Sequence, residues 1–265
     1  MSSRTESYQP VLDERRTIWQ STNLCRTDYG CLVGQWDAGA VTALRAGVYN
    51  ADGSVVGVVR ERLIEQVLQL AGDGLLDAIA QHVEGAVDLA AHCVAALRER
   101  YWDGDEELAD QLQAALGRGA TPLLRPLPVD LEELASLLEG DPLCGSGRID
   151  LRTGACWPDS VDDGRDDRDE DDEDRWLHVV YLGSREGYRD MELFIATVED
   201  PALVERLQTA ITGKGAFRRF KEVLSCWPHE LQRYYLLSND RQRGRARAWL
   251  AAEGFRPAGA AKPRS

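Results

Sequence analysis

The chain has 265 residues, of which 43% are hydrophobic and 29% are charged, and its formal net charge is −14. This hydrophobic fraction is large enough for a packed core, which excludes a wholly disordered protein. A membrane helix needs about 20 apolar residues in succession, whereas the longest stretch without a charged residue has nine, so membrane-spanning helices are excluded as well. The first residues, MSSRTESYQP, lack the apolar segment of a signal peptide, which predicts a cytoplasmic protein with no membrane contact.

The first 116 residues predict a mainly helical domain with a short β segment. GCLVGQW predicts a strand, and Asp52-Gly53 between β-branched residues is typical of a hairpin turn. Apolar residues at helical spacing begin after Arg60, and we expect Gly72 and Gly74 to end that first helix. The predicted elements are a strand at 30–36, a hairpin at 48–59 and helices at about 60–71, 75–101 and 106–116.

Residues 117–128, GRGATPLLRPLP, contain three prolines and two glycines, which predicts a linker and a domain boundary. A second domain is expected over residues 129–256, followed by a disordered tail at 257–265. Its predicted elements are a helix at 129–140 capped by Asp130, a hairpin at 148–157 that turns at Thr153-Gly154, a strand at 176–182, and helices that begin near Ser184, Asp200, Gly215 and Pro228.

The charges are unevenly distributed along this second part. Residues 159–174 hold eleven acidic residues and two arginines, whereas residues 211–265 hold twelve basic and four acidic residues. An acidic run of this kind cannot bury surface, so we expect a disordered loop, inserted at the tip of a hairpin because a predicted strand lies on each side. The run does not fit a calcium loop, since Val161 occupies a position where such a loop has an oxygen ligand.

The six cysteines and four histidines show no spacing typical of a zinc site or a redox pair. We therefore expect buried, reduced thiols. No nucleophile or acid–base arrangement identifies a reaction, so the catalytic residues are unknown, and neither a metal nor another cofactor is predicted.

Four segments follow one another in the second part: DLEELASLLEG, DLRTGACW, GYRDMELFIATVEDPALVERLQTAITGKGAFRRFKEVL and RARAWLAAEGF. In this order they resemble the bacterial uncharacterised protein family 0158 over about residues 129–256. The resemblance implies an α+β domain, and it implies no established activity, substrate or cofactor. For the whole chain we expect an α+β fold, with a mainly helical N-terminal domain and a small antiparallel sheet packed with several C-terminal helices.

GKGAFRRFKEVL, residues 213–224, is the strongest candidate for a binding segment. Glycines on both sides of Lys214 at the start of a helix are typical of a loop whose backbone N–H groups hold an anion, although no P-loop motif is present. Most of the segment is better explained by an amphipathic helix that has Phe217 and Phe220 in the core. Its remaining cations, which would then lie in solvent, are Arg218, Arg219 and Lys221.

RQRGRARAWL, residues 241–250, is the second candidate. Arg241 and Arg245 would form one ridge of an amphipathic surface helix, and Arg243 and Arg247 another. A basic face for anions or nucleic acid would combine Lys214, Arg218, Arg219, Lys221, Arg243 and Arg247. The acidic run could instead occupy this face within the same chain, and the sequence leaves both interpretations open.

Asp190 and Glu192 lie beside Arg185 and Arg189, and we expect exposed ion pairs on a helix rather than a carboxylate site. The sequence favours a non-enzymatic cytoplasmic binding or regulatory protein with a basic C-terminal surface. The alternative is an enzyme or binder that acts on a phosphorylated or nucleic-acid ligand at the Lys214–Lys221 segment. The sequence does not decide whether the partner is a protein or a nucleic acid.

Overall fold

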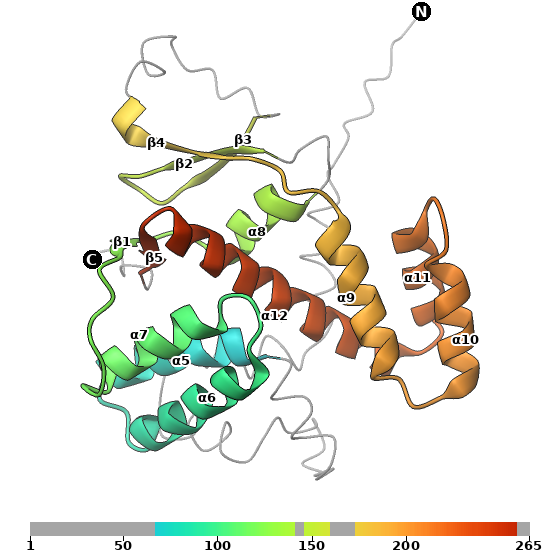
Figure 1. Ribbon diagram of the computed structural model, residues 1–265, viewed down its shortest axis with the longest axis horizontal. Helices are drawn as coiled ribbons and strands as arrows, with labels where there is room; N and C mark the ends of the chain where they lie inside the picture. The colour runs from blue at the N-terminus through green and yellow to red at the C-terminus, as the bar shows by residue number, and fades with distance from the viewer. Residues whose placement is uncertain (1–66, 141–145, 160–172, 259–265) are drawn as a thin grey trace, which may run out of the picture.

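A computed structural model of the chain describes residues 67–140, 146–159 and 173–258. Within these ranges the protein has eight α-helices, a short 3-10 helix and two small β-sheets, which confirms the predicted α+β class (Figure 1). The strand predicted at 30–36, the hairpin predicted at 48–59 and most of the acidic run lie outside the described residues. None of the helices in these ranges combines the length and the hydrophobicity that crossing a bilayer requires.

Three helices from the first half of the chain pack together as a small bundle. They are α5 (Leu68–Ala80), α6 (Ala86–Arg100) and α7 (Asp105–Ala115). Their buried apolar side chains form one cluster, to which only these three helices contribute: Leu68, Leu75, Ala90, Cys93, Val94, Leu97, Leu108, Ala109 and Leu112. We call this unit the α5–α7 bundle.

The predicted helix break at Gly72 and Gly74 is wrong, because α5 runs through both glycines. A Cβ atom added to Gly72 would lie only 2.5 Å from a methyl carbon of Leu108, so glycine is what lets α5 pack closely against α7. The chain instead turns between α5 and α6, where His82 and Gly85 adopt left-handed backbone angles (φ 57° and 81°). The long helix predicted over 75–101 is therefore two helices.

A three-stranded antiparallel sheet lies at one end of the molecule. Its strands are β2 (Gly147–Asp150), β3 (Cys156–Pro158) and β4 (Trp176–Val179), in the order β3-β2-β4. The predicted turn at Thr153-Gly154 joins β2 to β3, and Gly154 donates a hydrogen bond to the carbonyl of Asp150 at 2.7 Å. The predicted position of the acidic run at a hairpin tip is wrong, because β3 and β4 both pair with β2 and not with each other.

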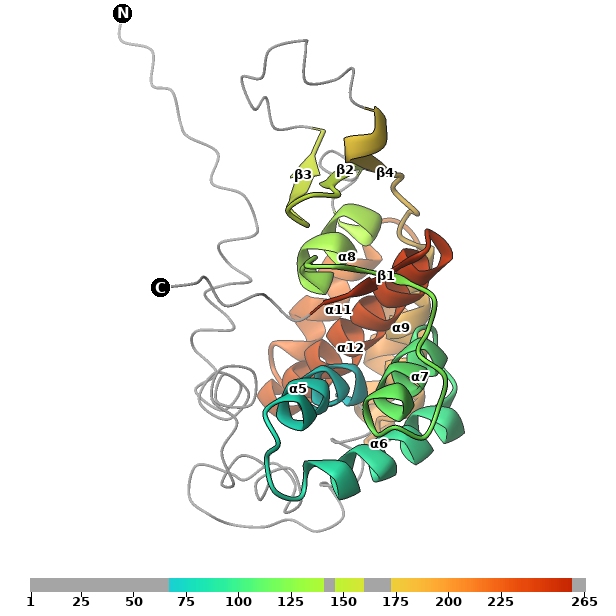
Figure 2. The same cartoon turned by 90° about the vertical axis from the view of Figure 1, so that its left-hand side faces the viewer.

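Helix α8 (Leu131–Glu139) connects this sheet to the rest of the protein. As predicted, Asp130 caps it, and its carboxylate accepts a hydrogen bond from the backbone N–H of Glu132 at 2.7 Å. The buried side of α8 joins a cluster with Ile149 of β2 and Val179 of β4, and with Ala246 and Leu250 of α12 (Pro228–Ala252). The sheet thus packs on α8, which packs on α12 (Figure 2).

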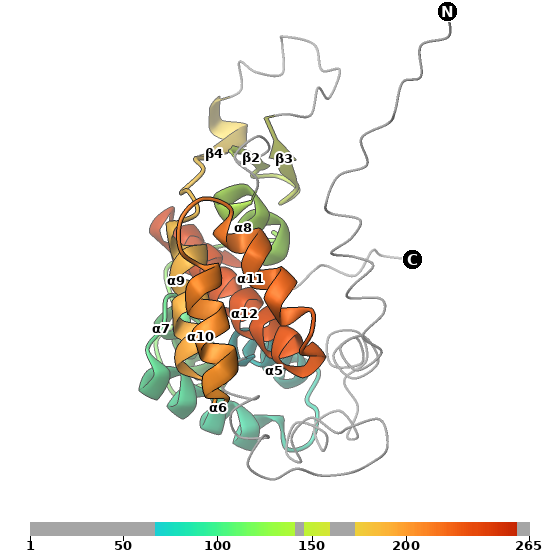
Figure 3. The same cartoon turned by 90° about the vertical axis from the view of Figure 1, so that its right-hand side faces the viewer.

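Helices α9 (Arg185–Ala196), α10 (Pro201–Ala210) and α11 (Ala216–Leu224) pack beside the first half of α12 (Figure 3). Asp200 caps α10 ahead of Pro201, as predicted. The cluster that these helices form is centred on three rings in edge-to-face contact, those of Phe194, Phe220 and Tyr234. Phe217 was expected in the same core, but its side chain is exposed at the edge of the cluster, so that prediction is wrong.

The segment predicted to be a linker contains a short strand. β1 (Arg125–Leu127) pairs in parallel with β5 (Phe255–Pro257). The C-terminal end of α12 is therefore anchored beside the N-terminal end of α8. The division into domains at 117–128 stays a prediction, because α12 contacts the α5–α7 bundle as well as α8, α9 and α11.

Phe220→Ala should lower the free energy of unfolding by about 3–5 kcal/mol, because it empties a fully buried ring position between two aromatic neighbours. Phe217→Ala is the matched control. This residue is 36% exposed, so the loss should be clearly smaller. Urea denaturation of both variants checks the ranking, and equal losses would show that Phe217 packs more tightly than the structure indicates.

Candidate functional site

The buried charges of α12 form the most unusual polar arrangement among the described residues. Five charged side chains lie between residues 240 and 247 of this helix. The prediction of an amphipathic surface helix here is wrong, because Arg241 and Arg245 are buried and the side chain of Arg247 is 0% exposed. We call these residues, with their partners, the α12 ion-pair layer: Asp240, Arg241, Arg243, Arg245 and Arg247, paired with Asp73, Arg100, Glu139 and Asp190.

One side of the layer faces α8 and α9. The buried carboxylate of Asp190 on α9 accepts hydrogen bonds from Arg241 and from Arg245, the latter at 2.9 Å. Arg245 also binds Glu139 at the end of α8, with 2.6 Å between Nη2 and Oε2. Asp190 was expected in an exposed ion pair on its own helix. That prediction is wrong, because Asp190 faces inward, toward cations that lie about fifty residues later in the chain.

The other side of the layer faces the α5–α7 bundle. Asp73 lies between Arg243 and Arg247, at 3.0 Å and 2.5 Å. Burial by itself raises the pKa of Asp73, but the two guanidinium groups outweigh it and hold that pKa below its usual value. Arg247 also donates from Nε to the side-chain oxygen of Gln69 at 2.8 Å. The guanidinium groups of Arg243 and Arg247 therefore bind partners within the protein.

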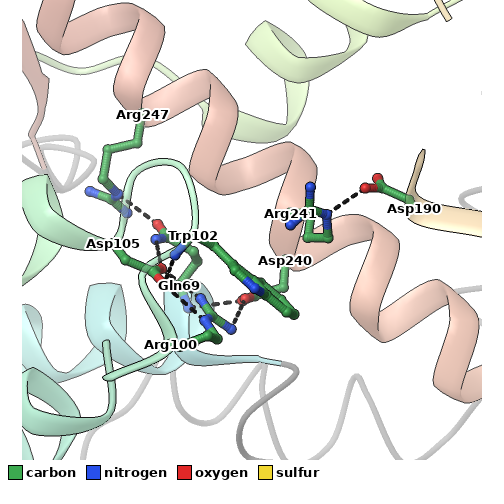
Figure 4. Close-up of polar contacts among 8 residues, drawn as sticks. All are labelled: Gln69, Arg100, Trp102, Asp105, Asp190, Asp240, Arg241 and Arg247. Carbon is green, nitrogen blue, oxygen red and sulfur yellow. Dashed lines mark hydrogen bonds and ion pairs between the residues drawn. The ribbon is translucent and has the colours of Figure 1, made fainter. Parts of the chain in front are cut away.

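Asp240 completes this side (Figure 4). It accepts a hydrogen bond from the backbone N–H of Gln69 at 2.8 Å and one from Arg100 at 2.7 Å. Arg100 in turn binds Asp105, and its guanidinium lies 4.2 Å from the ring centroid of Trp102. Arg241 reaches the same ring from α12, at 5.0 Å. Trp102 thus contacts one cation from the α5–α7 bundle and one from α12.

The carboxylates of the layer have pKa values that are shifted in opposite directions. Burial raises the pKa of Asp240 to about 6, although Arg100 and the Gln69 N–H favour its charged form. Burial also raises the pKa of Glu139, against the effect of Arg245. The layer therefore contains carboxylates on either side of their usual range, with Asp73 below it and Asp240 above it.

A backbone contact fixes the distance between α12 and the bundle. Gly104, which precedes α7, has φ +79°, and a Cβ atom placed on it would lie 2.1 Å from the carbonyl oxygen of Gly244. A Cβ atom on Gly244 would likewise lie 2.2 Å from the carbonyl oxygen of Asp103. Only glycine at both positions lets the two backbones come this close.

The geometry suits a structural role for this layer. Each of its charged side chains has an oppositely charged partner within hydrogen-bonding distance, and these partners come from α5, α6, α8 and α9. Sequence reasoning missed Asp73, Arg100 and Asp240, whose partners lie far along the chain. A glycine within an arginine-rich helix, at Gly244, is the one local signal that could have indicated a buried crossing.

The cations predicted at the α10–α11 turn differ in their contacts and exposure. Arg219 donates to the backbone carbonyls of Ala210 at 3.1 Å and Thr212 at 2.7 Å, and also to that of Lys214, so it holds the turn together. Arg218 is 82% exposed and lies 3.5 Å from Glu222. Lys214 is exposed, and Lys221 lies over the ring of Tyr235.

The structure does not gather the six predicted binding residues on one face. Lys214, Arg218, Arg219 and Lys221 belong to the α10–α11 turn and α11, whereas Arg243 and Arg247 turn toward Asp73 of α5. The residues of this set that are both exposed and not held by protein carbonyls, rings or a buried carboxylate are Lys214 and Arg218.

The thiols agree only in part with the prediction. Cys93 is buried and Cys156 partly buried, and burial raises the pKa of each to about 12, so both stay protonated and unreactive. Cys226 is exposed, which contradicts the prediction for that residue, and the other cysteines lie outside the described ranges. In the part of the chain that the structure describes, no group of three or more His, Cys, Asp or Glu side chains is arranged to hold a metal ion.

Comparison with known proteins confirms the resemblance inferred from the sequence. Residues 159–262 match the uncharacterised protein family UPF0158. The UPF0158 protein PA5073 of Pseudomonas aeruginosa is 28% identical over 145 residues, which are 54% of this chain and 94% of that protein. No solved structure matches the chain. The second half of the chain therefore resembles a family without an established function.

Asp190→Ala should lower the free energy of unfolding by about 3–5 kcal/mol, because it leaves two buried guanidinium groups without their shared carboxylate. Glu222→Ala is the control. It removes a carboxylate from an exposed pair with Arg218 and should cost less than about 1 kcal/mol. Chemical denaturation measures both, and a small loss for Asp190→Ala would mean that water can enter the layer and solvate the arginines.

Asp240→Asn should change how stability depends on pH. In the unfolded chain the pKa of an aspartate is about 3.9, whereas in the folded protein that of Asp240 is about 6. The folded state therefore binds a proton more tightly, and the wild type should lose stability relative to the variant as pH rises from about 4 to about 6. Urea denaturation of both proteins from pH 3.5 to 8 tests this. A wild type that instead gains stability over that interval would show that Arg100 dominates over burial.

Proposed function

We propose that the chain is a non-enzymatic binding or regulatory protein of the cytoplasm, and that the α10–α11 turn is the basic part of its surface that contacts a partner. The observation that carries the proposal is the contrast between two sets of cations. The arginines between residues 241 and 247 of α12 are paired with carboxylates of other helices, whereas Lys214 and Arg218 extend from a turn that Arg219 holds in shape.

The position of these two side chains favours an anionic partner. They lie at the start of α11, where the unpaired backbone N–H groups of a helix carry partial positive charge. A phosphate group placed there would meet Lys214, Arg218 and that helix terminus together. Nucleic acid is the partner that we test first, because its repeated phosphates suit two exposed cations without demanding a shaped pocket.

The buried charges support binding over catalysis. Asp73, Asp240 and Glu139 have shifted pKa values, as catalytic carboxylates often do, but each is paired with an arginine from another element. Their pairing connects helices to one another. We therefore assign them to the fold and place the function on the exposed surface.

The test is a titration of labelled single-stranded and double-stranded DNA and RNA with the full chain at two salt concentrations. We expect weak, sequence-indifferent binding that falls as salt rises. Replacing Lys214 and Arg218 together by alanine should reduce the slope of log affinity against log salt by about 1 for each phosphate that the protein no longer neutralises. Arg98→Ala is the matched control, since Arg98 is an exposed arginine on α6 with an exposed partner, Asp110.

A deletion variant that lacks residues 160–172 tests the hypothesis that the acidic run covers the basic surface. Tighter binding by the shortened chain would support it. If neither chain binds nucleic acid at low salt, the nucleic-acid assignment fails. Lys214 and Arg218 would then be available to a protein partner alone.

A further inference from the structure

The α5–α7 bundle has a hydrophobic core of its own. The cluster within it draws every buried member from residues 68–112, and the clusters around α8 and around α9–α11 contain no residue from that range. Among the residues that the structure describes, apolar burial therefore stabilises the bundle internally and contributes little to its attachment to α12.

Polar contacts join the bundle to α12 instead. Asp73 binds Arg243 and Arg247, and Asp240 binds Arg100 and the backbone of Gln69. Polar joints between units of one chain are the kind that permit relative motion. The close contact between Gly104 and Gly244 restricts which surfaces can pair here, because a side chain at either position would collide with the facing backbone.

The match to the uncharacterised family includes only part of the ion-pair layer. Residues 159–262 include both Asp190 and its partners Arg241 and Arg245. They also include Asp240, Arg243 and Arg247, but the partners of these three lie at residues 69–111, outside the matched region. Glu139, the second partner of Arg245, lies outside it as well. One face of α12 is thus covered by a module that the family match does not include.

We propose that the α5–α7 bundle is a detachable module, and that the face of α12 formed by Asp240, Arg243, Gly244 and Arg247 is a docking surface that also accepts the bundle of a second copy of the chain. Charge complementarity selects this occupant, since a second copy offers the same carboxylate at Asp73, the same cation at Arg100 and the same glycine at Gly104. The exposed connection at 117–121 lies between the bundle and β1, outside the contacts that the exchange would break.

Two full-length variants with opposite defects test the proposal. Asp73→Lys gives a bundle that the arginines of α12 repel, and Arg243→Glu with Arg247→Glu gives an α12 face that repels the bundle. Each variant alone should show weaker hydrogen-exchange protection in α5 and at residues 240–247, while α9–α11 keep theirs. When the two are mixed, each bundle faces a complementary α12 on the other copy. A 1:1 complex should form, and the protection of these segments should return.

The matched control is a mixture of Asp110→Lys and Arg98→Glu, which makes charge reversals in an exposed pair of the same bundle. It should leave protection unchanged and produce no complex. Two results would overturn the proposal. Weaker protection in α9–α11 of either interface variant would show that the bundle is not separable. Absence of a complex in the interface mixture, with α9–α11 intact, would show that the α12 face does not accept a bundle from another copy.

Discussion

The pairing of arginines with carboxylates along α12 is the constraint on which the rest of the arrangement depends. Asp190 fixes α9 against this helix, Glu139 fixes the end of α8, and Asp73 fixes α5. Each buried charge would be strongly destabilising without its partner. Helices α5, α8 and α9 therefore have little freedom to shift along α12 while all these ion pairs remain formed.

This design replaces one large core with several small ones. The hydrophobic clusters among the described residues stay within their own groups of helices and strands, and α12 passes between them. Burying charge gives up part of the stability that apolar contacts of the same area would provide. In return, the hydrogen-bonding geometry of each guanidinium admits few alternative partners, so the charged joint defines how the units are oriented.

The same arrangement separates cations that hold the fold from cations that can bind. Arg219 uses its donors on the carbonyls of the α10–α11 turn, and this contact presents its neighbours Lys214 and Arg218 to solvent. Arg243 and Arg247, which have the same chemistry, are occupied by Asp73. A residue type therefore says less about function in this chain than its partner does.

Local signals in the sequence determined the α+β class and several element boundaries. Asp130 and Asp200 cap their helices through hydrogen bonds to residues only two positions later, so a short pattern is enough to predict them. The ion-pair layer depends on contacts such as Asp73 with Arg247, which are separated by 174 residues. Periodicity alone could not show whether the arginines of α12 face water or a carboxylate, because a charged helix face has the same pattern in both cases. Only the packing of distant elements around α12 decided that these charges lie inside the protein, where each is stable because another element supplies its counter-charge.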